Sequence, residues 1–570
     1  MSNSAGDTPP ALRWPRPSGA LALWRTWRGQ RRASPAWTVL VGAILAVMAL
    51  PVATVIYLAL GDRGGNFLHL ARTVLQPSLI ETATLMLGVG VITLVVGTGT
   101  AWIVTMHRFP GRTLIDHLLV LPLAIPTYIV AYAYAEILDY AGPLQSGLRA
   151  LMGGGEWLPD IRSRGGAIFV LSGVLYPYVY LAARASFVQQ SVCVLEVART
   201  LGRTPLGAFL AVGLPLARPA LMAGVALVLM ECLNDLGAVQ YLGVRTLSAS
   251  IYDTWLQRSS LGGAAQIAAI LLLLVAALFA VERLARGNSQ YHHTTGRYRA
   301  IPFADLTGWR AAAAFAACAL PFLIGFAAPF GVIAMNAWHH IELAQEAGFW
   351  MAAGNSVLLS ATTAMAAVGT ALALAYARRV ASNGFTRPAV RLAGLGYALP
   401  GTVLALGLLI PLAALDNHID AFTRQAFGSK VGLLVTGTML VLVVAYTVRF
   451  LAVALGGIEA GLERISANLD AAARSLGETA MSALWRIHLP LLMPALGTAG
   501  LLVFVDAMKE LPATLLLRPF NFETLATHVY AFASLEQLEA ASVGSLAIVL
   551  VGLVPVVLLH RAIATGRAGH

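Results

Sequence analysis

Charged residues and cysteines are scarce in this sequence. Only 11% of its 570 residues are charged and 58% are hydrophobic. Soluble chains carry about 25% charged residues, so this chain has too little polar surface to cover a soluble globule. Its three cysteines, Cys193, Cys232 and Cys318, stand far apart. That spacing excludes a disulfide framework and a cysteine-based metal site, and we expect three buried thiols.

Lysine is scarcer still, since Lys430 and Lys509 are the only two in the chain. A nucleotide-binding P-loop needs a glycine-rich turn that ends in Gly-Lys-Ser or Gly-Lys-Thr, and neither lysine stands in such a setting. We therefore expect no nucleotide site and no bound cofactor in this chain.

Long apolar runs are abundant. A helix needs about 20 apolar residues to cross the roughly 30 Å of hydrocarbon in a bilayer, and without water only a helix satisfies its own backbone there. The sequence predicts an all-α polytopic membrane protein with about twelve transmembrane helices. The predicted spans are residues 37–60, 80–106, 115–137, 165–185, 212–235, 262–283, 311–336, 352–377, 392–415, 431–454, 487–511 and 541–561.

The net charge of +11 reflects membrane topology and does not indicate nucleic-acid binding. With the N-terminus inside, 27 of the 38 Lys and Arg residues fall in the segments on the cytoplasmic side, where Arg449 is counted with segment 449–486. The opposite loops hold 10. The positive-inside rule then predicts that both termini are cytoplasmic, in a multi-pass protein of the bacterial inner membrane.

The chain is an internal duplication. Residues 196–221 align with residues 471–496 at an offset of 275 without a gap, and the spans that contain Pro126 and Pro400 align at an offset of 274. Each unit holds six predicted spans, an even number, so the repeats are parallel. The predicted organisation is a cytoplasmic segment 1–36, a first repeat 37–283, a cytoplasmic linker 284–310, a second repeat 311–561 and a cytoplasmic tail 562–570.

One cytoplasmic loop in each repeat carries a shared pattern, an acid-x-Ala-x3-Gly segment followed nine residues later by aliphatic-x-Leu-Pro. Apolar residues at i, i+4 and i+7 predict a short helix that lies on a surface, and the glycine suits its C-terminal end. The candidate residues are Glu196, Ala198, Gly202, Leu214 and Pro215 in the first copy and Asp470, Ala473, Gly477, Leu489 and Pro490 in the second.

This pattern resembles the Glu-Ala-Ala loop of ABC importer permeases. The resemblance implies the type I permease fold, no enzymatic activity in this chain, and docking on two copies of an ATPase subunit that uses ATP. The loops on the other side are short, so a separate periplasmic binding protein is expected to deliver the substrate. A helix that packs only on its own bundle is the alternative. In the second copy Ala471 replaces the acid and Asp470 precedes it, so the salt bridge usual at this position is expected to be shifted or absent, and the two loops need not be equivalent.

Four acids repeat between the halves inside predicted spans. Glu231 and Asp235 correspond to Asp506 and Glu510, and each pair has helical i, i+4 spacing, which predicts one shared helix face. Ionisable groups inside a membrane are candidates for a substrate path, and carboxylates are hard ligands for a cation. The alternative is that these acids brace helix ends, with Lys509 neutralising a neighbour.

The stretches 121–138, 230–255 and 506–530 resemble fused two-repeat ferric-iron permeases. The resemblance implies Fe(III) as substrate, with transient contact only and no stable metal site. Tyr128 and Tyr132 are candidate oxygen donors on the path, although aromatic residues in spans more often serve packing. The alternatives are the same machine for thiamine, a polyamine or an oxyanion, and a secondary transporter driven by an ion gradient.

Overall fold

The computed structural model describes residues 35–61, 67–153, 158–189, 204–286, 304–381 and 383–565. Over this part of the chain it is almost wholly helical, and eleven helices are long and apolar enough to cross a membrane. A pair of helices bent by 97° brings the number to twelve if the pair is counted as one broken span. The predicted all-α fold with about twelve spans is therefore confirmed.

Within the described residues, the first repeat holds sixteen short and long helical elements, in which η marks a single 3-10 or π segment. They are α2 (Pro35–Gly61), α3 (Phe67–Leu70), η1 (Ala71–Leu75), α4 (Gln76–Met106), α5 (Arg112–Leu118), η2 (Leu121–Ala124), α6 (Thr127–Leu138), α7 (Pro143–Met152), α8 (Arg164–Gln189), α10 (Pro205–Ala208), η3 (Phe209–Gly213), α11 (Leu214–Asn234), α12 (Gly237–Tyr241), α13 (Leu247–Tyr252), η4 (Asp253–Gln257) and α14 (Leu261–Arg286).

The second repeat has a closely related order. Its elements are α15 (Gly308–Phe322), η5 (Leu323–Ala327), α16 (Ala328–His339), η6 (Ile341–Gln345), α17 (Ala347–Val380), α18 (Thr386–Ala393), η7 (Gly394–Ala398), α19 (Gly401–Phe427), α20 (Leu440–Glu463), α21 (Ala467–Ser475), α22 (Ala480–Ala483), η8 (Leu484–His488), α23 (Leu489–Met508), α24 (Pro512–Leu517), α25 (Leu525–Ser534) and α26 (Leu538–Thr565). Two short strands, β1 (His107–Arg108) and β2 (Ala304–Asp305), pair in parallel.

The third span of each repeat is broken, which corrects the single spans predicted at 115–137 and 392–415. Pro126 and Pro400 precede α6 and α19 with extended backbones, at ψ 143° in both cases. Proline has no N–H to donate and restricts the residue before it to extended conformations, so each helix stops before the proline and a new one starts after it. The break places the start of α6 beside Gly237 and the start of α19 beside Arg449 and Glu510.

Each repeat packs its first and last spans against the other repeat. Helix α2 contacts α14 of its own repeat and α18 and α19 of the second, while α16 contacts α26 of its own repeat and α6 of the first. The repeats are therefore interlocked and do not lie simply side by side.

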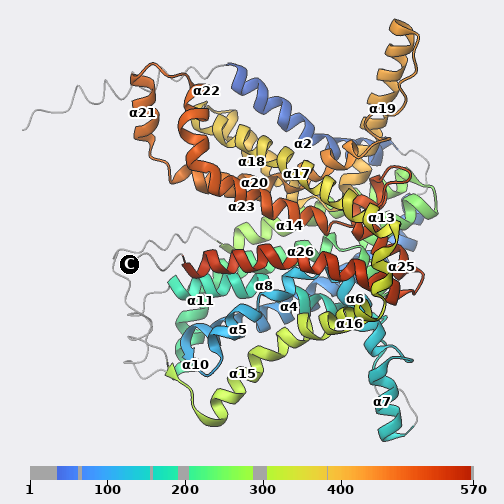
Figure 1. The fold of residues 1–570 in the computed structure, drawn as a ribbon, viewed down its shortest axis with the longest axis vertical. Helices are drawn as coiled ribbons and strands as arrows, with labels where there is room; N and C mark the ends of the chain where they lie inside the picture. The colour runs from blue at the N-terminus through green and yellow to red at the C-terminus, as the bar shows by residue number, and fades with distance from the viewer. Residues whose placement is uncertain are drawn as a thin grey trace, which may run out of the picture.

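The two ends of the molecule differ. Helices α10, α21 and α22 lie at one end, where the two halves are far apart (Figure 1). Helices α13 and α25 lie at the opposite end, where the halves meet, and α7 projects from that end. We call these the coupling-loop end and the opposite end.

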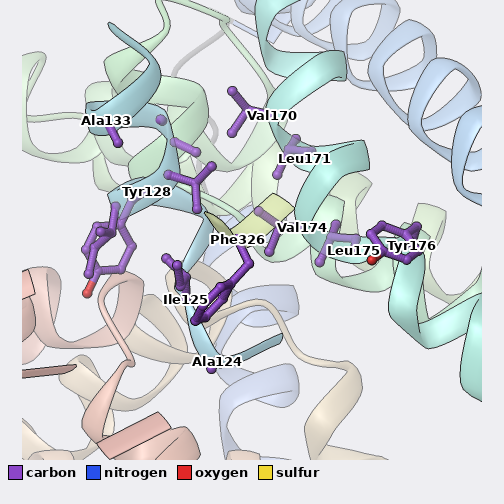
Figure 2. Packing of buried hydrophobic residues seen from close by; sticks show 14 of the residues in the cluster. Ala124, Ile125, Tyr128, Ala133, Val170, Leu171, Val174, Leu175, Tyr176 and Phe326 are labelled. Atoms are coloured by element: carbon purple, nitrogen blue, oxygen red, sulfur yellow. The ribbon is translucent and has the colours of Figure 1, made fainter. Parts of the chain in front are cut away.

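A large apolar cluster supports the broken third span of the first repeat. Figure 2 shows Ile125 and Tyr128 beside Val170, Leu171 and Val174 of α8, with Phe326 of η5 from the second repeat against them. This packing fixes the start of α6, which carries the residues described next.

Candidate functional site

A cavity of about 120 Å³ lies between the two repeats. Its walls come from the start of α6, the ends of α11 and α23, and the middle of α20. The four predicted acids all line it, together with two cationic side chains and several polar groups: Glu231, Asp235, Asp506, Glu510, Lys509, Arg449, Asn234, Thr127, Tyr128, Tyr178 and Tyr397. The structure thus brings the four acids and Tyr128 together, whereas Tyr132 is not among the lining residues.

The predicted shared helix face of each acid pair is wrong. Helix α11 ends at Asn234, and Asp235 follows it with an extended backbone at ψ 130°. Helix α23 ends at Met508, so Glu510 also lies beyond its helix. Pro512 opens α24, at a helix position where its missing N–H would have no partner within the helix.

Both of these acids cap the short helix that follows. The Asp235 carboxylate accepts from the backbone N–H of Val239 at 3.0 Å. The Glu510 carboxylate accepts from the backbone N–H groups of Ala513 and Thr514 at 3.2 and 3.3 Å. Unpaired N–H groups at a helix start favour a carboxylate, so the two loops after α11 and α23 are built alike.

Glu510 also belongs to a buried ion pair of the second repeat, which a hydrogen bond extends to the first repeat. Its Oε1 lies 3.1 Å from Arg449 Nη1, and the two side chains are 1% and 8% exposed. Arg449 donates to Asn234 Oδ1 at 3.0 Å, and the same oxygen accepts from the N–H of Gly401 at 2.9 Å. Asn234 belongs to the first repeat and the other three residues to the second, so this network ties the halves together.

The network corrects the placement of Arg449. The charge pattern of the sequence placed it in the cytoplasmic segment 449–486, but it lies within α20 and is only 7% exposed. Hydropathy alone allows a single arginine at the boundary of an apolar run to lie either in the span or in the cytoplasmic segment that follows it. Its position opposite Glu510 depends on the packing of α20 on α23.

The other three acids are also engaged. Tyr397 donates its hydroxyl to Glu231 Oε1 at 2.6 Å, and Thr127 donates to Asp235. Lys509 Nζ lies 3.0 Å from Asp506 Oδ1. Every acid of the cavity therefore has a partner, as the bracing alternative requires. With four carboxylates and two cations, the cavity walls keep an excess of negative charge.

No group of three or more His, Cys, Asp or Glu side chains is arranged to hold a metal ion within the described ranges. His340, from the His339-His340 pair, has Nε2 3.3 Å from Glu539 and its Nδ1 against a backbone carbonyl.

Two loops close the cavity on the side away from α10 and α22. A Cβ on Gly237 would lie 2.7 Å from Cδ2 of Leu511 and 2.8 Å from Cβ of Tyr128. Leu236 and Leu511 are 0% and 1% exposed. The loops after α11 and α23 therefore touch each other, and apolar side chains from both repeats seal this side.

The second predicted coupling loop forms a capped helix. In α21 the helix ends in a Schellman motif, since Glu478 N–H donates to Ala473 O and Gly477 N–H donates to Arg474 O, both at 3.0 Å. Gly477 has φ +79°, a conformation that favours glycine. Leu489 and Pro490 open α23. Leu476 is 82% exposed beside this turn.

Asp470 makes the shifted salt bridge of the second loop within the chain. Its Oδ2 lies 2.8 Å from Arg379 at the end of α17, and its Oδ1 lies 2.7 Å from Nε2 of the buried His488. Arg379 also donates to the backbone carbonyls of Leu462 and Ile465. The helix α21 is thereby fixed to the ends of α17, α20 and η8.

The first coupling loop is described only in part. Glu196, Ala198 and Gly202 lie outside the described residues. Beyond them, Thr204 accepts from the N–H of Gly207 at 3.1 Å and α10 begins at Pro205, as an N-cap followed by proline predicts. Leu214 and Pro215 open α11.

The geometry defines a class, a polytopic permease of two interlocked repeats with a polar cavity at their interface. Residues 94–288 match the family described as binding-protein-dependent transport system inner membrane component. The chain belongs to this family, so it is a multi-pass inner-membrane transport subunit and not an enzyme. This assignment replaces the alternative of an ion-gradient-driven carrier.

Three relatives illustrate the range of the family. The chain is 26% identical over 489 residues to the Fe(3+)-transport system permease protein FbpB 2 of Haemophilus influenzae, covering 85% of this chain and 89% of that protein. It is 32% identical over 202 residues to a putative 2-aminoethylphosphonate transport system permease protein of Salmonella choleraesuis, covering 34% and 70%. It is 35% identical over 153 residues to the sulfate transport system permease protein CysT of Escherichia coli, covering 26% and 52%.

Proposed function

We propose that this chain is the conducting subunit of an importer that receives ferric iron from a periplasmic binding protein and passes it to the cytoplasm. The observation that carries the proposal is the cavity between the repeats, in which four carboxylates outnumber two cationic groups. Oxygen donors suit a hard cation. The relative that spans both repeats is named for Fe(3+) transport, which supports the same substrate.

The partners and orientation follow from the coupling-loop end. We place this end and both termini in the cytoplasm, because most Lys and Arg residues fall on that side. The coupling residues are Glu196, Ala198, Gly202, Leu214 and Pro215 in one loop and Asp470, Ala473, Gly477, Leu489 and Pro490 in the other. Two loops require two copies of the ATPase subunit, which uses the ATP.

An exposed apolar surface beside α21 and α22 fits this docking role. Leu476, Met481 and Trp485 are 82%, 51% and 63% exposed. Large apolar side chains grouped on one surface mark an interaction site. In this proposal, closure of the ATPase pair moves α21, and its ties to α17 and α20 carry the movement into the membrane.

The test is a reconstituted complex of this chain with its ATPase and binding protein in lipid nanodiscs. We expect the binding protein loaded with ferric ion to stimulate ATP hydrolysis several-fold over the unloaded protein. Stimulation by sulfate, thiamine, a polyamine or 2-aminoethylphosphonate in place of ferric ion would refute the iron assignment and leave the permease assignment intact.

An oxyanion is the second candidate substrate, because Arg449 and Lys509 line the cavity and two of the relatives are named for anion transport. Both cationic groups are already paired, Arg449 with Glu510 and Lys509 with Asp506. An anion would have to compete with these carboxylates at close range, so the geometry favours a cation.

A further inference from the structure

Three tyrosine rings form a continuous row beside the central cavity. Tyr128 and Tyr132 lie on successive turns of α6, and Tyr241 ends α12. The ring centroids of Tyr128 and Tyr132 are 5.8 Å apart, and those of Tyr132 and Tyr241 are 4.6 Å apart. The first two are the tyrosines predicted from the sequence, whereas the third is brought to them only by the fold.

The hydroxyl groups of this tyrosine row are buried, and none has a hydrogen-bond partner among the residues that the structure describes. Burying a hydroxyl without a partner costs free energy, and packing alone would be served as well by phenylalanine. On the same helix, the hydroxyl of Tyr134 does have a partner, since it donates to Ile324 O at 2.6 Å. Figure 2 shows the Tyr128 hydroxyl pointing away from the apolar cluster that holds its backbone.

The inner end of the row reaches the central cavity, which Tyr128 lines. At the other end, the Arg162 guanidinium lies 5.2 Å from the centre of the Tyr241 ring. Arg162 lines a second cavity, of about 370 Å³, together with Asp139, Asp160 and Glu536. The tyrosine row therefore connects two cavities, and the second one lies at the opposite end of the molecule from the coupling loops.

The second cavity has the charge and the donors of a cation entrance. The Arg162 guanidinium lies 2.8 Å from Glu536 and 3.6 Å from Asp139, and Asp160 adds a third carboxylate to the lining of the cavity. Gln145 also lines this cavity and is only 3% exposed. Its Nε2 donates to Leu158 O, but its Oε1 has no partner within the described part of the chain.

We propose that the tyrosine row is the route by which a hard, oxygen-seeking cation passes from the second cavity to the central one. This inference rests on the proposed function and deepens it. Each neutral hydroxyl offers an oxygen lone pair to the cation in turn and keeps its own proton. Such contacts are weaker than those of a carboxylate cluster, which suits passage rather than storage.

The test replaces the hydroxyls and keeps the rings. The variants Tyr132→Phe and Tyr128→Phe/Tyr132→Phe/Tyr241→Phe are reconstituted with ATPase and ferric-loaded binding protein in liposomes. Uptake of radioactive ferric ion and ATP hydrolysis are measured together. We expect ferric uptake to fall at least tenfold in the triple variant, while stimulation of ATP hydrolysis by the loaded binding protein stays within twofold of the unsubstituted protein.

Tyr176→Phe is the matched control, because the Tyr176 hydroxyl is equally buried and unpartnered but Tyr176 lies on α8, outside the row. Uptake by this variant should be unchanged. Unchanged uptake in the triple variant, or an equal loss in Tyr176→Phe, would overturn the tyrosine route. A lack of ferric uptake by the unsubstituted protein would instead overturn the proposed substrate, so the two failures are distinguishable.

Discussion

At the scale of single residues, Gly401 is the position where the central network leaves no space for a side chain. A Cβ there would lie 2.7 Å from Arg449 Nη1 and 2.9 Å from Glu510 Oε1. We expect Gly401→Ala to push the ion pair apart and to lower the free energy of unfolding by about 1–3 kcal/mol, the usual cost of overpacking. Thermal unfolding in detergent, followed by tryptophan fluorescence, measures the loss.

The control for Gly401→Ala is Gly497→Ala in α23, where an added Cβ meets nothing within 4 Å. That change should be neutral or slightly stabilising, because alanine favours a helix over glycine. A Gly401→Ala protein as stable as the Gly497→Ala protein would show that the ion pair has room to shift.

Arg449 offers a second test of the same network. Arg449→Met should leave the Glu510 carboxylate buried without its partner and destabilise the protein by about 3–5 kcal/mol, as measured by thermal unfolding. The double variant Arg449→Met/Glu510→Gln should recover a large part of this loss, because no charge is then left buried. Equal losses in the single and double variants would contradict a role for charge.

These residues also show what the sequence could and could not reveal of the site. The 275-residue offset placed Glu231, Asp235, Asp506 and Glu510 in corresponding positions, and the structure lines one cavity with all of them. Asn234, Tyr397 and Gly401 were not predicted, because polar or small residues in an apolar run carry no periodic signal. Their role depends on contacts across the two repeats, which only the packing creates.

At the scale of elements, the turn after α21 is the clearest case in which local chemistry decides the structure. Gly477 at φ +79° ends the helix, and a β-branched residue strains that conformation. We expect Gly477→Val to tilt or unwind α21 and to reduce stimulation of ATP hydrolysis at least tenfold, while the protein still inserts in the membrane. ATPase assays of the reconstituted complex measure the effect.

Gly432→Val is a matched control for this turn. Gly432 has φ +71° and open space around it, but it lies in the loop after α19, far along the chain from the coupling loop. The backbone strain is therefore similar, and ATPase stimulation should be retained. If the Gly477→Val protein retained transport and stimulated ATP hydrolysis, this result would contradict the coupling role of α21.

Element boundaries show why hydropathy predicts the spans better than their breaks. The twelve apolar runs reflect the thickness of the bilayer, which acts on any sequence, and the count was confirmed. The breaks at Pro126 and Pro400 were missed although both prolines were aligned. Proline inside a membrane helix is tolerated when neighbours satisfy the freed backbone groups, so its effect depends on the packing around it.

At the scale of the whole molecule, the two repeats differ in how the short segment before the fifth span packs against the second span. We call this contact, made by η3 in the first repeat and by η8 in the second, the joint of each repeat. The 275-residue offset pairs Gly213 of η3 with His488 of η8, and each faces an aromatic ring from the second span of its repeat. Gly213 faces Trp102, while the His488 ring lies 5.3 Å from that of Tyr376 and its Nε2 lies 2.7 Å from Asp470 Oδ1 of the coupling helix. One joint is therefore apolar and closely packed, and the other is polar.

This difference predicts that substitutions at Gly213 and Trp102 do not change the free energy of unfolding independently of each other. A Cβ on Gly213 would lie 2.9 Å from Cζ3 of Trp102, an atom of the six-membered part of the indole that a phenylalanine ring cannot reach. We expect Gly213→Ala alone to cost about 1–3 kcal/mol of unfolding free energy and Gly213→Ala/Trp102→Phe to cost less than the sum of the two single changes. A double-mutant cycle by thermal unfolding measures a coupling of at least about 0.5 kcal/mol if the contact is as close as the structure has it. Additive losses would mean that η3 can move away from α4 without cost, and the close contact of the first joint would then not contribute to stability.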